Sequence, residues 1–444
     1  ATSEQLKEAF DNLQKALAAS PKTSAADRAY ISALAKRYSS NPTADQSALA
    51  RAYSAAMRDL VRQFPNDLDA ATLYAESMMN LRPWQLWARD GTPAENTLDI
   101  VSVLEGVLRR NPRHLGANHY YIHAVEASPH PERALPSARR LAALAPSSGH
   151  LVHMPSHVYI RTGEYGAAAR SNADAVKVDE AYIKRFGGPN FYSMMYTEHN
   201  IHFLASASAM AGRYQDAATN GRRVANDATA MVEQMPMLEF FALYPLVVEV
   251  RFHKWDEIAK LNAPDPRLKL LTAYWHFARG MAMAGTHRAV EASAELGLLR
   301  DTVRSIPADL PMGNNTAGIY FGLCESMLAG AAAIAGGNRS TGLAALRKAF
   351  EDSLEVNYNE PPDWDLPVAE FLGPALLTAG SFADAERVYR TELKQRPNNG
   401  RALLGLAEAL RRQSKTVEAR KAAAEFRTAW READTPLSSK DLYR

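Results

Sequence analysis

The chain has a single cysteine, Cys324, among its 444 residues. One cysteine excludes an intrachain disulfide, and it also excludes a zinc site built on pairs of cysteines. A transition-metal site in this chain therefore has to use histidine and carboxylate ligands.

An excess of charge of one sign is also missing. The 51 lysines and arginines are balanced by 49 aspartates and glutamates, which leaves a net charge of +2. Nucleic-acid-binding proteins carry a basic surface, so we expect no nucleic-acid partner. Apolar runs are short, and the best of them, 240–250, contains Pro245 and Glu249. We expect no membrane-spanning segment.

Several catalytic motifs are absent from the sequence. Neither HExxH nor the phosphate-binding GxxxxGK[ST] occurs, and GxGxxG and GxSxG are missing as well. These absences argue against a zinc protease of the HExxH type, against nucleotide chemistry and against a serine hydrolase of the α/β type.

Alternating apolar and polar runs, which would indicate strands, are scarce throughout the chain. Alanine, leucine, arginine and glutamate dominate instead, and apolar residues recur at helical spacing, as in 6–17. Hydrophobic residues make up 47% of the chain and charged residues 23%, which is typical of globular proteins. The sequence therefore predicts an all-α protein without strands.

Glycines and prolines divide the helical pattern at regular intervals. Gly163, Gly212 and Gly380 are each followed two residues later by an aromatic residue and five residues later by alanine. Pro112 and Pro146 are 34 residues apart (146 − 112 = 34), and we take this interval as the repeat period. Pro65 and Pro397 also fit the position after the second helix of a repeat. Glycine permits a tight turn between two helices, whereas proline ends the second helix.

This punctuation resembles that of the tetratricopeptide repeat (TPR) superfamily, in a bacterial all-α type with histidine-rich central repeats. The resemblance implies a helix–turn–helix repeat solenoid, either open or curled around a central groove. It also implies that the groove receives a peptide or a small molecule. We expect an N-terminal helical cap in 1–64, His-rich repeats with two insertions in 65–235, irregular helical repeats in 236–360, and C-terminal repeats in 361–444 with a loose tail from 433.

The two insertions lengthen the repeats on either side of the histidine-rich stretch. They fall in 82–97, which contains Trp84 and Trp87, and in 184–195, which contains Phe191 and Tyr192. Insertions in repeat proteins map to loops, often on the binding face. We interpret both as candidate lids; the alternative is a neutral elaboration of loops.

Two His-x-x-x-His pairs are the strongest chemical signal. His119 and His123 form the first pair, His153 and His157 the second, and the two pairs are offset by the same repeat period (153 − 119 = 34). A spacing of four places both rings of a pair on one face of a helix. The repeat then places the pairs on neighbouring helices, so four imidazoles are expected to face one another in a shared hollow.

Further candidates share the repeat phases of these pairs. His150 and His199 each precede a turn glycine by the same interval (163 − 150 = 13 and 212 − 199 = 13), and His202 comes three positions after His199. Glu126 and Glu76 fall on related phases and are candidate catalytic carboxylates or partners of the ligands. The predicted metal ligands are His119, His123, His150, His153, His157, His199 and His202.

Pro155 lies inside the second pair and leaves two interpretations open. A proline within a helix removes a hydrogen bond and kinks the helix, which would re-aim His153 against His157. Alternatively, the helix begins only at Pro155, which weakens the argument from the spacing of four.

Together these features predict a metalloprotein with a histidine cluster in the groove of the array. Imidazole suits copper, iron and zinc, and we favour a copper- or iron-dependent oxidoreductase acting on a small molecule, with one or two ions per chain. The alternatives are a peptide- or protein-binding module with a structural metal, a zinc-dependent hydrolase, and a metal storage or delivery protein.

The first residue, Ala1, is consistent with a mature product cut after an export signal. A periplasmic or secreted location is therefore expected. The alternative is a cytoplasmic protein whose initiator methionine was removed.

Overall fold

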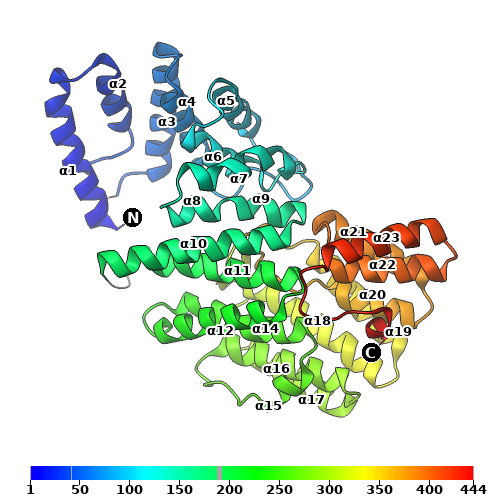
Figure 1. Ribbon diagram of the computed structural model, residues 1–444. Coiled ribbons are helices and arrows are strands. Elements are labelled where there is room, and N and C mark those ends of the chain that lie inside the picture. Colours follow the sequence, from blue (N-terminus) through cyan, green and yellow to red (C-terminus); the bar gives the residue numbers. More distant parts are fainter. Residues whose placement is uncertain (1, 42, 188–192, 444) are drawn as a thin grey trace. The chain divides into compact units, whose positions relative to one another are not determined.

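The computed structural model describes residues 2–41, 43–187 and 193–443. The described chain is built almost entirely from helices (Figure 1). It forms two compact units, Ala1–Pro146 and Ser147–Arg444. Each unit is described by itself below.

Unit 1 consists of short antiparallel helices, each packed on the next along the chain. They are α1 (Ser3–Ala19), η1 (Ser20–Lys22), α2 (Ala25–Leu34), α3 (Gln46–Gln63), α4 (Leu68–Met79), α5 (Thr97–Arg110), α6 (Leu115–Val125), η2 (Pro131–Ala134) and α7 (Leu135–Leu144).

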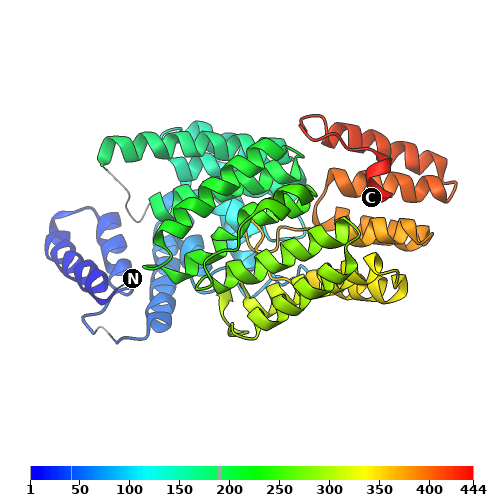
Figure 2. The same cartoon turned by 90° about the horizontal axis from the view of Figure 1, so that it is seen from below.

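Unit 2 continues as a series of helix pairs, which Figure 2 shows from α16 to α23. Its elements are α8 (Gly149–His153), α9 (Pro155–Thr162), α10 (Tyr165–Phe186), η3 (Ser193–Thr197), α11 (Glu198–Met210), α12 (Tyr214–Met231), η4 (Pro236–Leu238), α13 (Glu239–Ala242), α14 (Tyr244–Arg251), α15 (Trp255–Lys260), α16 (Lys269–Gly285), α17 (Ala289–Val303), β1 (Pro311–Met312), β2 (Asn315–Thr316), α18 (Ala317–Ala335), α19 (Arg339–Ser353), α20 (Ala369–Thr378), α21 (Phe382–Gln395), α22 (Gly400–Arg412), α23 (Thr416–Ala429) and η5 (Ser439–Tyr443).

The predicted helix–turn–helix repeat fold is confirmed. The three turn glycines, Gly163, Gly212 and Gly380, all have a positive φ of 76–78°, which is a conformation that glycine adopts without steric cost. Each lies between the two helices of a pair, where the sequence predicted it. Neighbouring pairs then bury their apolar faces against one another, as in repeat solenoids.

The repeats continue through 236–360, where the sequence pattern is irregular. At the turns of α14–α15 and α16–α17 the positive-φ position is held by histidine, His253 (φ 53°) and His287 (φ 60°), instead of glycine. The turn geometry is therefore kept although its sequence signature is lost. The expectation of no strands needs one small correction, since β1 and β2 form a two-stranded antiparallel hairpin.

The largest apolar core belongs to unit 2 and centres on α14, α16 and α18. By length and composition, α18 could cross a membrane, which differs from the expectation drawn from short apolar runs. Half of its most apolar window is nevertheless buried inside the protein, where Phe321 and Met327 join the core. A buried core helix passes the same test, so this one helix is weak evidence for a membrane span.

The inner side of the unit 2 array is occupied by its own chain. The irregular segment 360–366 between α19 and α20 is largely buried. Tyr244 of α14 donates a hydrogen bond to Asp365, and the ring of Trp364 lies 5.0 Å from that of Tyr320 of α18. Because these contacts go to the first helices of two pairs, α14–α15 and α18–α19, we name residues 360–366 the inner segment.

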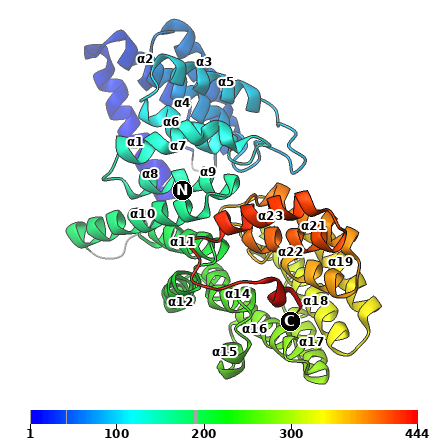
Figure 3. The same ribbon diagram turned by 45° about the vertical axis from the view of Figure 1, so that its right-hand side comes forward.

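The start of the C-terminal tail lies against the α11–α12 turn. Asp434 accepts hydrogen bonds from the backbone N–H groups of Tyr214 and Gln215, at 2.7 and 2.9 Å. The ring of Trp430 packs so closely on Gly212 that a Cβ at that glycine would clash with it. Unit 2 therefore curls back on itself, with α22 and α23 beside the α11–α12 turn (Figure 3).

Candidate metal centre

Three histidines of unit 2 come together at the start of the array. His153 is the last residue of α8, His157 lies in the first turn of α9, and His199 lies in the first turn of α11. α8 and α9 are joined through Met154, whose backbone is helical (φ −49°, ψ −35°). Pro155 begins α9 and has no N–H to donate, so the ladder of hydrogen bonds is interrupted between the two ligand candidates.

The Nε2 atoms of the three rings converge on one point. His153 Nε2 lies 2.7 Å from His157 Nε2 and 3.2 Å from His199 Nε2. Nitrogens bound to one tetrahedral ion at about 2.0–2.1 Å lie roughly 3.3 Å apart, so the His153–His199 separation matches that of two ligands of one ion, and the His153–His157 separation is shorter. His153 and His157 are almost completely buried, and His199 is partly buried.

A hydrogen bond behind one ring and a carboxylate behind another favour one tautomer of each. Asn172 donates from Nδ2 to the carbonyl oxygen of Ala168, so its Oδ1 faces His153 Nδ1 at 2.6 Å as an acceptor. His157 Nδ1 lies 3.2 Å from a carboxylate oxygen of Glu360. His153 Nδ1 therefore carries the proton and its Nε2 carries a lone pair, and the carboxylate beside His157 Nδ1 favours the same tautomer in that ring.

The surroundings keep the cluster dry and its central ring neutral. Phe203 is fully buried, and its ring centroid lies 5.2–5.9 Å from those of all three histidines. Burial first, and then the neighbouring rings of His157 and His199, hold the pKa of His153 well below its usual range. A neutral imidazole is the form that binds metals.

His150 lies next to the cluster. Its ring stacks on that of His153 with centroids 6.1 Å apart, and it meets the ring of Tyr196 edge-on at 5.3 Å. Within unit 2 it is a neighbour of the cluster and not one of the three histidines whose nitrogens come together.

The first predicted pair lies in unit 1, on α6. The rings of His119 and His123 are 5.0 Å apart and nearly perpendicular, which confirms that the spacing of four places them on one helix face. His123 Nδ1 lies 3.2 Å from Glu126, which is buried at the end of the same helix. The expectation that this pair meets His153 and His157 in one hollow involves both units and stays a prediction.

The other candidates in unit 1 are placed as follows. Glu76 lies on α4, where Asn80 donates a hydrogen bond to it and burial raises its pKa. In the first insertion, Trp87 donates from Nε1 to the carbonyl oxygen of Ala124 at 2.8 Å, while Trp84 is 57% exposed. Phe191 and Tyr192 of the second insertion lie outside the described residues.

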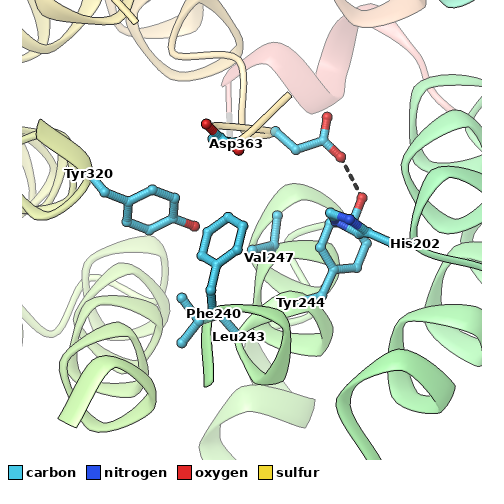
Figure 4. A pocket seen from close by; sticks show the side chains of 8 residues that line it. His202, Phe240, Leu243, Tyr244, Val247, Tyr320 and Asp363 are labelled. Atoms are coloured by element: carbon cyan, nitrogen blue, oxygen red, sulfur yellow. Dashed lines mark hydrogen bonds between the residues drawn. The ribbon is translucent and has the colours of Figure 1, made fainter. Parts of the chain in front are cut away.

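His202 is one helical turn beyond His199 but points elsewhere. Its ring lies edge-on against Tyr244, with centroids 4.4 Å apart, and burial lowers its pKa to about 3. It lines a separate small cavity with room for about one water molecule (Figure 4). The cavity is lined by His202, Phe240, Leu243, Tyr244, Val247, Tyr320, Asp363 and Asp365.

Two residues of this centre were missed by the sequence interpretation. Asn172 lies on α10, the second helix of its pair, whereas candidates were sought on first helices. Glu360 belongs to the irregular inner segment, far along the chain from the histidine it meets (360 − 157 = 203). No repeat phase links either residue to the pairs, so only the folded chain reveals them.

Comparisons with known proteins add little to this picture. Neither a family model nor a curated protein matches the chain. Among solved structures, the chain is similar to yeast Tom70, at 10% identity and a TM-score of 0.33, covering 95% of this chain and 68% of that one.

It is also similar to Naa15/Naa10 bound to HypK-THB, at 12% identity and a TM-score of 0.33, covering 92% of this chain and 64% of the other, so it spans about two thirds of that protein. The APC/C hetero-tetramer Cut9–Hcn1 aligns at 9% identity and a TM-score of 0.27, covering 95% of this chain and 96% of that one. Likeness this distant carries no argument about function, and the TPR-like fold rests on the helix pairs themselves.

Proposed function

We propose that unit 2 binds one transition-metal ion through His153, His157 and His199. The supporting observation is the 2.7 Å approach of His153 Nε2 to His157 Nε2, with an acceptor oxygen facing Nδ1 of each ring. Two lone pairs at that distance repel each other unless a positive centre lies between them. A shared proton needs only two nitrogens, whereas a metal ion explains why a third converges at 3.2 Å.

The donor set favours copper over iron. Three neutral nitrogens suit copper or zinc, while non-haem iron sites usually combine two histidines with a carboxylate ligand. Glu360 lies on the Nδ1 side of His157, away from the point where the Nε2 atoms meet. Three protein ligands leave a coordination position for a small molecule, as in catalytic sites.

From this ligand set we infer a metal-dependent enzyme acting on a small substrate. Copper in these ligands would give an oxidoreductase. We propose a periplasmic or secreted location for it. Zinc in the same ligands would instead activate a water molecule for hydrolysis. The identity of the bound metal separates the two reactions.

The peptide-binding alternative has less support in unit 2. A peptide-binding array needs an open inner face, whereas the inner segment lies against the first helices of two pairs, α14 and α18. Its carboxylates are already engaged, since Asp363 accepts hydrogen bonds from the backbone N–H of Asn314 and the side chain of Asn315, both at 2.8 Å.

The test is metal analysis of the full chain purified without nickel resin. We expect about one equivalent of metal per chain, lost in a variant carrying alanine at His153, His157 and His199. A matched variant with alanine at His130 and His287, which are both exposed, should keep its metal. Equal metal content in the two variants would refute the proposal.

Because the triple variant removes two buried rings, His199→Ala alone is the milder companion. It leaves the almost fully buried His153 and His157 in place. We expect it to stay folded by circular dichroism and to lose most of its affinity for Zn²⁺ and Cu²⁺. Unchanged affinity for both ions would also contradict the proposal.

A further inference from the structure

We infer that Glu360, on the inner segment, is a positioning residue of the metal centre, acting through His157. This inference rests on the proposed function, since it assigns a role toward the ion that His157 would bind. Glu360 lies near neither histidine pair in the sequence, and the repeat period does not relate it to them.

The geometry behind His157 carries the inference. A carboxylate oxygen of Glu360 lies 3.2 Å from His157 Nδ1, and both side chains are at most 3% exposed. A buried carboxylate at this position keeps the proton on Nδ1, leaves the lone pair on Nε2, and makes that nitrogen a stronger donor. It also fixes the plane of the ring, so that Nε2 keeps pointing at His153.

Glu360 is itself held in place by its neighbours. Tyr358 donates a hydrogen bond to its other carboxylate oxygen, and the guanidinium of Arg161 on α9 lies 5.4 Å from the ring centre of Tyr358. Further along, Asp363 and Asp365 anchor the segment to the β1–β2 turn and to α14. The carboxylate therefore reaches His157 from a segment fixed at several points.

The arrangement divides the centre between two distant parts of the chain. The ligands come from α8, α9 and α11, whereas the carboxylate comes from the segment before α20. The affinity for metal then depends on the inner segment being in place. Histidine–carboxylate partners of this kind typically change metal affinity by about 10- to 100-fold when removed.

The test compares Glu360→Gln and Glu360→Ala with the wild type. The metal-stripped full chain is titrated with Zn²⁺ in competition with a chromophoric chelator, and with Co²⁺ by its visible absorption. We expect roughly 10-fold weaker binding for glutamine, which keeps a neutral acceptor, and roughly 100-fold for alanine. Wild-type affinity in both variants would overturn the inference.

The matched control is Glu249→Gln on α14. Glu249 is also a buried glutamate that accepts a hydrogen bond from a tyrosine hydroxyl, that of Tyr214. We expect its affinity for Zn²⁺ to equal that of the wild type. An equal loss in this control and in Glu360→Gln would show a general effect of removing a buried charge, which also overturns the inference.

A second measurement does not depend on either variant folding. Long-range proton–nitrogen spectra of the ¹⁵N-histidine-labelled, metal-free wild type report which ring nitrogen of His157 carries the proton. We expect Nδ1, and a proton mainly on Nε2 would contradict the inference. If the wild type binds neither Zn²⁺ nor Co²⁺, the proposed metal site itself fails, a result distinct from a site that ignores Glu360.

Discussion

At the scale of single residues, the centre depends on groups behind the ligands as much as on the ligands. His153 is held by an amide whose orientation is fixed, because Asn172 donates to the carbonyl of Ala168. Its acceptor oxygen then faces Nδ1 at 2.6 Å. The direction of a lone pair at the centre is thus set by a residue that does not reach the ion.

Replacing Asn172 with alanine should weaken the site and the fold together. The buried Nδ1–H of His153 loses its acceptor, which costs about 1–3 kcal/mol of unfolding free energy. The ring also becomes free to change tautomer, so we expect Zn²⁺ affinity to fall by roughly 10-fold. Urea unfolding and competition titration of the metal-stripped chain measure the two effects.

The control for this change is Asn118→Ala in unit 1. Asn118 is also fully buried and donates to two backbone carbonyls, those of Pro112 and His114. The Asn118→Ala variant should have a lower free energy of unfolding and the same affinity for Zn²⁺ as the wild type. If both variants bind Zn²⁺ as the wild type does, Asn172 has a role in folding only.

A histidine at a turn gives the protein a dependence on pH. Burial, and then the positive charge of Arg401, lower the pKa of His253 to about 3. In the unfolded chain the imidazole of His253 is protonated below about pH 6.5, whereas in the folded chain it stays neutral. Stability is therefore complete above about pH 6.5 and falls by about 1.4 kcal/mol per pH unit below it, until the folded pKa is reached.

The variant His253→Asn should lessen this loss, because asparagine tolerates the left-handed backbone of the turn and does not titrate. Between about pH 7 and about pH 5 we expect the wild type to lose roughly 2 kcal/mol more than the variant, measured by urea unfolding. His287→Asn, at an exposed turn of the same conformation, is the control. Identical pH slopes in all three proteins would exclude the effect.

At the scale of elements, the helix pairs do not all cap themselves. α12 begins at Tyr214 after Arg213, and no side chain of its own caps its first turn. Asp434, from the C-terminal tail, supplies the acceptor for the N–H groups of Tyr214 and Gln215. Asp434 thus caps the N-terminus of a helix that is distant in the sequence (434 − 214 = 220).

We expect Asp434→Ala to lower the free energy of unfolding by about 1 kcal/mol, the usual loss when an N-cap acceptor is removed. Amide hydrogen exchange should rise in the first turn of α12 in particular. Asp309→Ala, at an exposed position in the loop before β1, is the control and should change neither quantity. Faster exchange confined to the tail would show that the cap contributes nothing to α12.

The elements also show where sequence reasoning reached its limit. The turn glycines Gly163, Gly212 and Gly380 were predicted correctly because a positive φ leaves a visible mark in the sequence. The turn at His253 has the same conformation with no glycine, so the pattern hid it, whereas the turn at His287 falls in 284–292, which still resembles a helix-pair turn in sequence. Pro155 left two interpretations open, and the structure combines them: one helix ends at His153 and the next begins at Pro155.

At the scale of the whole molecule, the sequence by itself determined the all-α repeat fold and proposed which histidines to examine. Both can be read along the chain, since the turns recur at a fixed interval and a histidine spacing of four places two rings on one face of a single helix. Only the tertiary structure decided that His153, His157 and His199 converge while His202 turns away to Tyr244. Which side chains meet depends on how successive pairs curl, and hence on the inner segment that brings Glu360 to His157 and on the tail that reaches α12.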